Sequence, residues 1–146
     1  MIKKTWDGLD VSEEPPYGAV IIIYKIVNGK ILYLVLHRAH KGENYEGRWA
    51  WGPPSGARFP SENIYTCMAR ELYEETGLIV NHKELDNKGR DWYIFYGEVP
   101  NETNIKLSLE HNKYNWLDFE DAIDICSPEV VKEQLKLVNN IIRERI

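Results

Sequence analysis

The sequence has few cysteines and no long hydrophobic run, and both absences exclude whole classes of protein. Its two cysteines, Cys67 and Cys126, lie in no close Cys/Cys or Cys/His pair, so neither a disulfide framework nor a zinc site is expected. The longest apolar stretch, Ala19 to Tyr24, is far shorter than the roughly 20 residues that a membrane-spanning helix needs. The amino terminus lacks the apolar core of a secretory signal. We therefore expect a cytoplasmic protein with no membrane partner.

Basic residues are also not in excess. The chain has 18 Lys and Arg against 23 Asp and Glu, a formal net charge of −5, which disfavours a nucleic-acid partner. Its 146 residues, 43% of them apolar, suffice for one domain with its own core. We interpret residues 1–16, which are largely polar and end in two prolines, as an N-terminal arm on a single domain spanning residues 17–146. A homodimer is left open.

Hydrophobic patterning predicts strands that are interrupted by clear turns. Residues 17–27 and 31–36 are rich in Val, Ile and Tyr, and Asn28-Gly29 between them is typical of a β-hairpin. Because both runs are nearly continuous in apolar residues, we expect these strands to be buried on both faces. Further strands are predicted at residues 49–51, 92–99 and 105–109.

Three helices are predicted. The first runs over residues 62–76, with Ser61 as its N-cap and Gly77 as a left-handed terminating residue. A short helix follows Asp118, and the last begins at Ser127-Pro128. The last helix has a buried stripe at helical spacing, formed by Val131, Leu135, Val138 and Ile142. The fold class is therefore α+β, an α/β/α sandwich with a mixed sheet.

Acidic residues lie on the apolar face of the first helix. With Ile64 at zero and about 100° per residue, Glu71 falls at about 340° and Glu75 at about 20°, the stripe that also holds Met68. Glu74 falls nearby, at about 280°. Carboxylates crowded against an apolar surface repel one another, and a divalent cation would compensate. The alternative is an ordinary solvated acidic helix.

The ligand type indicates which cation would bind. All of these candidates are oxygen donors, which suit a hard cation such as Mg²⁺ or Mn²⁺. Because Mg²⁺ is usually held by one or two carboxylates together with water and substrate phosphates, the site also predicts a phosphate-bearing partner.

The segment containing this helix resembles a known motif. From Gly56 it reads G-A-R-F-P-S-E-N-I-Y-T-C-M-A-R-E-L-Y-E-E-T-G-L, which resembles the Nudix box. The matching positions are Gly56, Glu62, Arg70, Glu71, Leu72, Glu74, Glu75, Gly77 and Leu78.

The resemblance implies a Nudix fold and metal-dependent hydrolysis of a nucleoside diphosphate linked to another group. It implies that Glu71, Glu74 and Glu75 bind metal or act as the base, and that the Gly56 carbonyl is a further metal ligand. Arg70 would then orient one of the glutamates. For Glu62, a direct and a supporting role both remain open.

Two further segments bear on the substrate. The segment E-H-N-K-Y-N-W-L is similar to one in asymmetric diadenosine tetraphosphate hydrolases and in some triphosphate pyrophosphohydrolases. This similarity implies that Glu110 is another metal ligand or base and that Tyr114 stacks on a nucleobase. The segment W-G-P-P-S-G is similar to the family's W-x-P-P-K-G but has Ser55 where a phosphate-contacting Lys is common.

Other residues could supply the missing charge or stack on a base. We expect Arg38, Lys41 and Arg58, together with Ser55, to bind the substrate. Additional candidates for stacking are Trp6, Tyr45, Trp49, Trp51 and Trp92. The leading hypothesis is thus a pyrophosphohydrolase with a small-molecule nucleotide substrate. The alternatives are a catalytically silent nucleotide-binding sensor and, less favoured by charge, an RNA 5′-end processing enzyme.

Overall fold

A long antiparallel hairpin forms the centre of the fold. The computed structural model describes residues 10–38, 42, 44–109 and 111–145. Strands β1 (Gly18–Val27) and β2 (Lys30–Arg38) pair with Val27 opposite Lys30. Asn28 and Gly29 form the turn with φ angles of 53° and 78°, the conformation that these two residue types tolerate best. The predicted hairpin and the burial of both its strands are confirmed.

The remaining strands complete a mixed sheet. Strand β6 (Trp92–Glu98) runs parallel to β1, with Val20 opposite Ile94. The antiparallel additions are β3 (Trp51–Gly52), β4 (Ser55–Ala57), β5 (Lys83–Glu84) and β7 (His111–Leu117). The order is β3-β2-β1-β6-β5, with β4 on β1 and β7 on β2.

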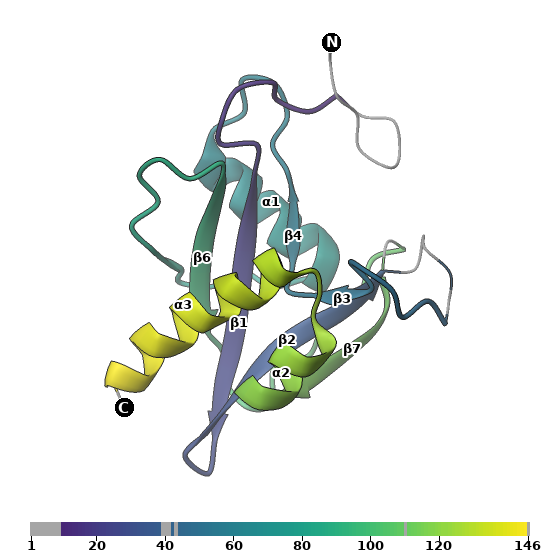
Figure 1. Cartoon of the computed structure of the whole chain (residues 1–146), viewed down its shortest axis with the longest axis vertical. Helices are drawn as coiled ribbons and strands as arrows, with labels where there is room; N and C mark the ends of the chain where they lie inside the picture. The colour runs from purple at the N-terminus through teal and green to yellow at the C-terminus, as the bar shows by residue number, and fades with distance from the viewer. Residues whose placement is uncertain (1–9, 39–41, 43, 110, 146) are drawn as a thin grey trace.

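Helices cover both faces of the sheet (Figure 1). Helix α1 (Ile64–Thr76) packs on one face, and α2 (Phe119–Ile125) and α3 (Glu129–Arg145) pack on the other. Alternate β1 residues serve the two layers, because successive strand side chains point to opposite faces. Ile21 packs in the core beneath α1, and Ile22 packs in the core beneath α3. This arrangement confirms the predicted α/β/α sandwich and the buried stripe on α3.

The start of α1 differs from the prediction. The helix begins at Ile64, and its N-cap is Asn63, whose side chain accepts a hydrogen bond from Tyr65 N at 2.8 Å. Ser61 instead has a φ of 64°, so it belongs to a turn before the helix. The end of the helix is as predicted, since Gly77 has a φ of 75° and its N–H donates to the Tyr73 carbonyl.

Two predicted short strands differ from the structure. Residues 105–109 form no strand, and the strand β7 instead follows at His111. Trp49 has a φ of 66° in a turn, so β3 contains only the end of the predicted 49–51 strand. Strand β4, which pairs with β1, was not predicted.

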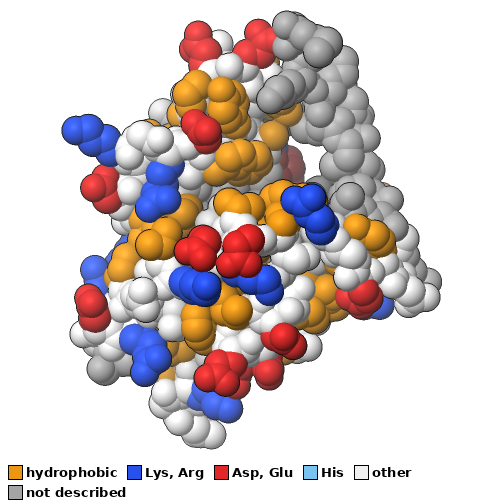
Figure 2. All heavy atoms as spheres, in the orientation of Figure 1, with side chains coloured by type: hydrophobic (Ala, Val, Ile, Leu, Met, Phe, Trp, Pro, Cys, Tyr) orange, Lys and Arg blue, Asp and Glu red, His pale blue; other side chains and the backbone are white. Residues whose placement is uncertain are grey.

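The surface over α3 has a mixed charge. Acidic and basic side chains are interspersed there (Figure 2). On this helix Lys136 lies 3.4 Å from Glu133 and 3.9 Å from Glu129. In the part of the chain that the structure describes, every helix is too short or too polar to cross a membrane.

Candidate active site

Two buried glutamates lie on the face of α1 that is turned toward the sheet. Glu71 and Glu75 are 8% and 2% exposed as whole residues and lie one helical turn apart, among residues of the core beneath α1. The inward orientation expected for these two residues is confirmed. Glu74 differs, because its side chain is 56% exposed. Two of the three carboxylates are therefore buried, and the third is open to solvent.

Strand β4 passes directly over the carboxylate of Glu71. A Cβ atom added to Gly56 would lie 2.0 Å from Glu71 Cδ and within 2.3 Å of both carboxylate oxygens. Only glycine allows this close approach of backbone and carboxylate. The Gly56 carbonyl also lies 3.9 Å from the Cys67 thiol. Burial raises the pKa of Cys67 to about 12, so this thiol is a neutral packing group.

The side chain of Arg70 holds Glu71 in place. Its Nη1 donates to Glu71 Oε1 at 2.7 Å, and its Nη2 donates to the Ala57 carbonyl at 3.1 Å. The other edge of the guanidinium forms a bidentate pair with Glu62, at 2.8 and 2.9 Å. The ring of Phe59 lies beneath it, 3.9 Å from Arg70 Cζ. Charge-assisted and bidentate bonds of this kind fix orientation as well as charge.

The carboxylate of Glu62 supports Arg70. Burial opposes ionisation of Glu62, but the hydrogen bonds from Arg70 and from the Phe59 N–H outweigh it, so the pKa of Glu62 lies below its ordinary value. Burial lowers the pKa of Arg70, but the bonds to Glu62 and Glu71 and the charges of these two residues outweigh burial and raise this pKa. Of the two roles left open for Glu62, the geometry favours the supporting one.

The depressed pKa of Glu62 makes part of the fold's stability dependent on pH. Because the folded state favours the charged form, the Glu62–Arg70 pair stabilises the protein above the ordinary pKa near 4.5, and this contribution is lost as pH falls through the lower folded value. We expect Glu62→Gln to lower the free energy of unfolding by roughly 1–3 kcal/mol at pH 7. Urea titrations should show this difference shrinking below pH 4.5.

A matched substitution tests whether the effect is specific. Glu144→Gln removes an exposed carboxylate near the end of α3 and should leave both urea curves unchanged. An equal loss for Glu62→Gln at neutral and acid pH would contradict the role given to its charge.

The carboxylate of Glu75 contacts two strands. Its Oε2 accepts a hydrogen bond from the Ser55 main-chain N–H at 3.2 Å, and its Oε1 lies 3.4 Å from His111 Nε2. His111 is itself buried, at 6% exposure. The carboxylate is thus fixed by β4 and by the first residue of β7, two elements that the sequence places far apart.

The donor set at this site fits a hard divalent cation. The buried carboxylates of Glu71 and Glu75 and the adjacent Gly56 main chain provide oxygen donors. Within the described residues, no three His, Cys, Asp or Glu side chains form a ready-made metal cluster. A cation that keeps water and substrate phosphates in its shell needs no such cluster. Glu110, the further ligand predicted by resemblance, lies outside the described residues.

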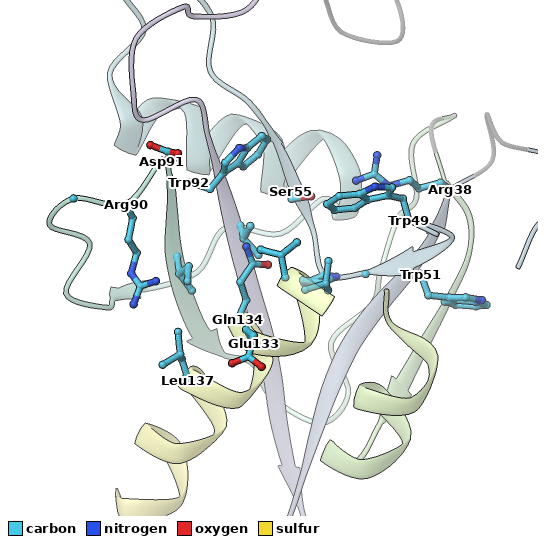
Figure 3. Close-up of a pocket in the computed structure, with 17 residues that line it drawn as sticks. Arg38, Trp49, Trp51, Ser55, Arg90, Asp91, Trp92, Glu133, Gln134 and Leu137 are labelled. Carbon is cyan, nitrogen blue, oxygen red and sulfur yellow. The ribbon is translucent and has the colours of Figure 1, made fainter. Parts of the chain in front are cut away.

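A cavity of about 720 Å³ lies on the opposite face of the sheet, which carries α3, and reaches β4 at Ser55. Ser55 joins this cavity to the carboxylate site, because its main chain binds Glu75 while the residue also lines the cavity. Trp92 lies to one side of Ser55, and Arg38 with Trp49 lies to the other (Figure 3). Arg38 Cζ is 5.9 Å from the centroid of the Trp49 ring. The other polar and aromatic residues of the lining are Trp51, Arg90, Asp91, Glu133 and Gln134.

The predicted substrate-binding residues do not all meet at this cavity. Arg38 and Ser55 line it, as do Trp49, Trp51 and Trp92 from the candidates for stacking. Tyr114, on β7, is 44% exposed and is not part of the lining. Arg58 instead directs its guanidinium toward residues 12–16 and Glu62. Lys41 and Trp6 lie outside the described residues.

Sequence reasoning missed some residues of the cavity. Arg90 and Asp91 come from the turn before β6, which carried no motif. Gln134 and Glu133 come from α3, beside its buried stripe. A signal was available for Gln134, because it lies four residues after Val130 and three before Leu137, at the spacing of one helix face.

Comparison with known proteins agrees with the motif and the fold. A family model described as NUDIX domain matches residues 16–139. Bis(5'-nucleosyl)-tetraphosphatase [asymmetrical] of Caenorhabditis elegans is 29% identical over 121 residues, covering 75% of this chain and 83% of the relative. A crystal structure of C. elegans Ap4A hydrolase superposes with a TM-score of 0.67 at 24% identity, covering 87% of this chain and 97% of that one.

A solved structure of bacterial origin has the same fold. A NUDIX hydrolase from Listeria monocytogenes superposes with a TM-score of 0.69 at 22% identity, covering 89% of this chain and 96% of that one. Nudix hydrolases generally use divalent metals. Because the family model spans most of the chain and a tetraphosphatase is related over most of its length, this protein belongs to the NUDIX family and is a hydrolase of phosphoanhydride bonds.

Proposed function

We propose that the chain is a Mg²⁺-dependent pyrophosphohydrolase that acts on dinucleoside polyphosphates and related nucleoside polyphosphates. The observation that carries this proposal is the pair of buried carboxylates, Glu71 and Glu75, fixed against the main chain of β4. Relatedness to a bis(5'-nucleosyl)-tetraphosphatase supports the substrate class. The cation could be Mn²⁺ instead, because the same oxygen donors suit both.

The residues of the carboxylate site would serve as metal ligands, as the base and as a positioning group. Glu71, Glu74, Glu75 and the Gly56 carbonyl would hold the metal, and a bound divalent cation would neutralise phosphate oxygens and lower the pKa of an attacking water. Glu71 or Glu74 takes the proton of that water. Arg70 orients Glu71 through the 2.7 Å bond. A bound cation would further offset the negative charge of the two buried glutamates, beyond the compensation that Arg70 gives to Glu71.

The cavity would bind the nucleoside portion of the substrate. Its volume of about 720 Å³ falls within the range of small-molecule sites, and the exposed rings of Trp49 and Trp92 offer surfaces on which a base can stack. Arg38, which lines the cavity, would contact a phosphate of the substrate. Ser55 would hydrogen-bond the substrate where related proteins commonly carry a Lys. Arg58 is not given a substrate role, because its guanidinium already binds protein groups.

A substrate panel tests this proposal directly. Dinucleoside tetraphosphates, nucleoside triphosphates and nucleotide sugars are incubated with the protein and Mg²⁺ in ¹⁸O-labelled water, and the products are identified by mass spectrometry. We expect turnover of a dinucleoside polyphosphate with one ¹⁸O atom incorporated into a product phosphate, and no turnover after chelation. Preferred hydrolysis of a nucleotide sugar would overturn the substrate class. Turnover that persists without any divalent metal would overturn the assignment of the carboxylates as metal ligands.

A further inference from the structure

Arg58 makes more hydrogen bonds to the protein than its surface position suggests. The side chain donates to the Pro16 carbonyl at 2.6 Å, the Glu14 carbonyl at 2.8 Å and Ser12 Oγ at 2.7 Å. It also donates to the Glu62 carbonyl at 2.9 Å. The family motif leaves the position of Arg58 unspecified, and the match to the family begins only at residue 16. The motif therefore accounts for neither Arg58 nor its partners at residues 12 and 14.

Residues 10–16, the described part of the N-terminal arm, bind both the main chain and the side chain of Arg58. The Ser12 main-chain N–H donates to the Arg58 carbonyl at 2.7 Å, while Ser12 Oγ accepts from the Arg58 guanidinium. Val11 and Ser12 are buried at 8% and 4% exposure. Ser12 Oγ also donates to the Glu14 carbonyl at 2.8 Å, which shapes the turn that Arg58 fills. The arm is thus part of the packed structure around the motif.

A continuous set of hydrogen bonds joins this arm to the active-site carboxylate. Arg58 binds the main chain of Glu62, and the side chain of Glu62 forms the bidentate pair with Arg70. The neighbouring Phe59 N–H donates to Glu62 Oε1 at 3.0 Å, and the Phe59 ring packs under Arg70. Arg70 then holds Glu71 Oε1. Residues 58–62 therefore pack around Arg70, and Arg58 binds this segment to the N-terminal arm.

We propose that Arg58 is a positioning residue, which uses the N-terminal arm as an anchor to hold the Glu62–Arg70–Glu71 set in its working geometry. The proposal rests on the proposed function, in which Glu71 serves the chemistry. Partners one step removed from a metal ligand, the place that Arg70 has here, typically influence affinity and activity by about 10- to 100-fold. Arg58 acts on Arg70 through Glu62, so its effect should be smaller. A guanidinium suits this task because its fixed fork can reach several carbonyls at once, whereas an ammonium acts as a single point.

Kinetics of three variants separate positioning from substrate contact. We expect Arg58→Ala to lower kcat by up to about 10-fold with little change in KM, because its effect reaches Glu71 through Glu62 and Arg70 and the substrate is not touched. Arg58→Lys should recover only part of this loss. Arg143→Ala, which removes an exposed arginine from the far end of α3, is the matched control and should retain the full kcat. A raised KM with unchanged kcat would show that Arg58 binds substrate and would overturn the proposal.

Hydrogen exchange measures the same coupling without substrate or metal. In Arg58→Ala, amide exchange followed by mass spectrometry should accelerate both in the arm and in residues 57–62, with α3 unaffected. Ser12→Ala, a milder change at the other end of the contact, should show the same two regions to a lesser degree. Faster exchange confined to the arm would overturn the proposal. Failure of the substrate panel alone would overturn the proposed function and leave this exchange result standing.

Discussion

Glu75→Gln is expected to lower kcat for the preferred nucleotide by at least about 100-fold, because it would weaken the hold on the cation that neutralises charge in the transition state. The substitution keeps the shape of the side chain and an oxygen that can accept the Ser55 N–H, so the packing of α1 against β4 should persist. What disappears is the negative charge of a carboxylate that is 2% exposed. The measurement is steady-state hydrolysis with Mg²⁺, together with a melting curve.

A neutralised carboxylate elsewhere is the control for this variant. Glu144→Gln, in the exposed last turn of α3, removes the same charge and should leave kcat unaltered. If Glu75→Gln retained the wild-type rate with every nucleotide tested, the assignment of the buried glutamates to the chemistry would fail.

Gly56→Ala should produce the second large effect, through a single methyl group. The added Cβ would stand 2.0 Å from Glu71 Cδ, so either β4 or the carboxylate must move. Overpacking of this kind typically costs about 1–3 kcal/mol of stability. Displacement of a catalytic group by about 1 Å can cost about 100-fold in rate, and we expect a kcat loss of that order.

The control for Gly56→Ala must lose stability without approaching the site. Gly29, in the β1–β2 turn, has a φ of 78° and open space around its Cα, so Gly29→Ala is strained but contacts nothing. It should lower the free energy of unfolding by about 1 kcal/mol and leave kcat intact when assayed well below the melting temperature. A full wild-type kcat for Gly56→Ala would show that Glu71 tolerates displacement and would remove it from the mechanism.

Elements with strong periodicity could be predicted from the sequence. The hairpin around Asn28-Gly29 follows from two apolar runs and a turn dipeptide, and α1 follows from its apolar stripe. The inward carboxylates of Glu71 and Glu75 follow from helix geometry alone, because their azimuth coincides with that of the core residues. Helix periodicity and turn preferences were enough for prediction wherever a single helix or turn determines the position of a side chain.

Features that depend on tertiary contacts could not be predicted. Ile105 and Leu107 alternate like a strand, yet they pack against the core beneath α1 without forming one. The sequence of β7 has little apolar patterning, and its pairing with β2 gives it strand structure. Arg58 carries the charge expected of a phosphate ligand, but the turn at residues 58–62 directs it to the N-terminal arm, a contact that no local pattern encodes.

The main chain and the side chain of Ser55 serve two different parts of the molecule. Its peptide N–H serves Glu75, and any residue except proline could supply that bond. The residue also lines the cavity, so its side chain can be substituted during evolution while the main-chain bond to Glu75 stays intact. Substitutions among relatives at this position can therefore change substrate preference in small steps while each variant stays active.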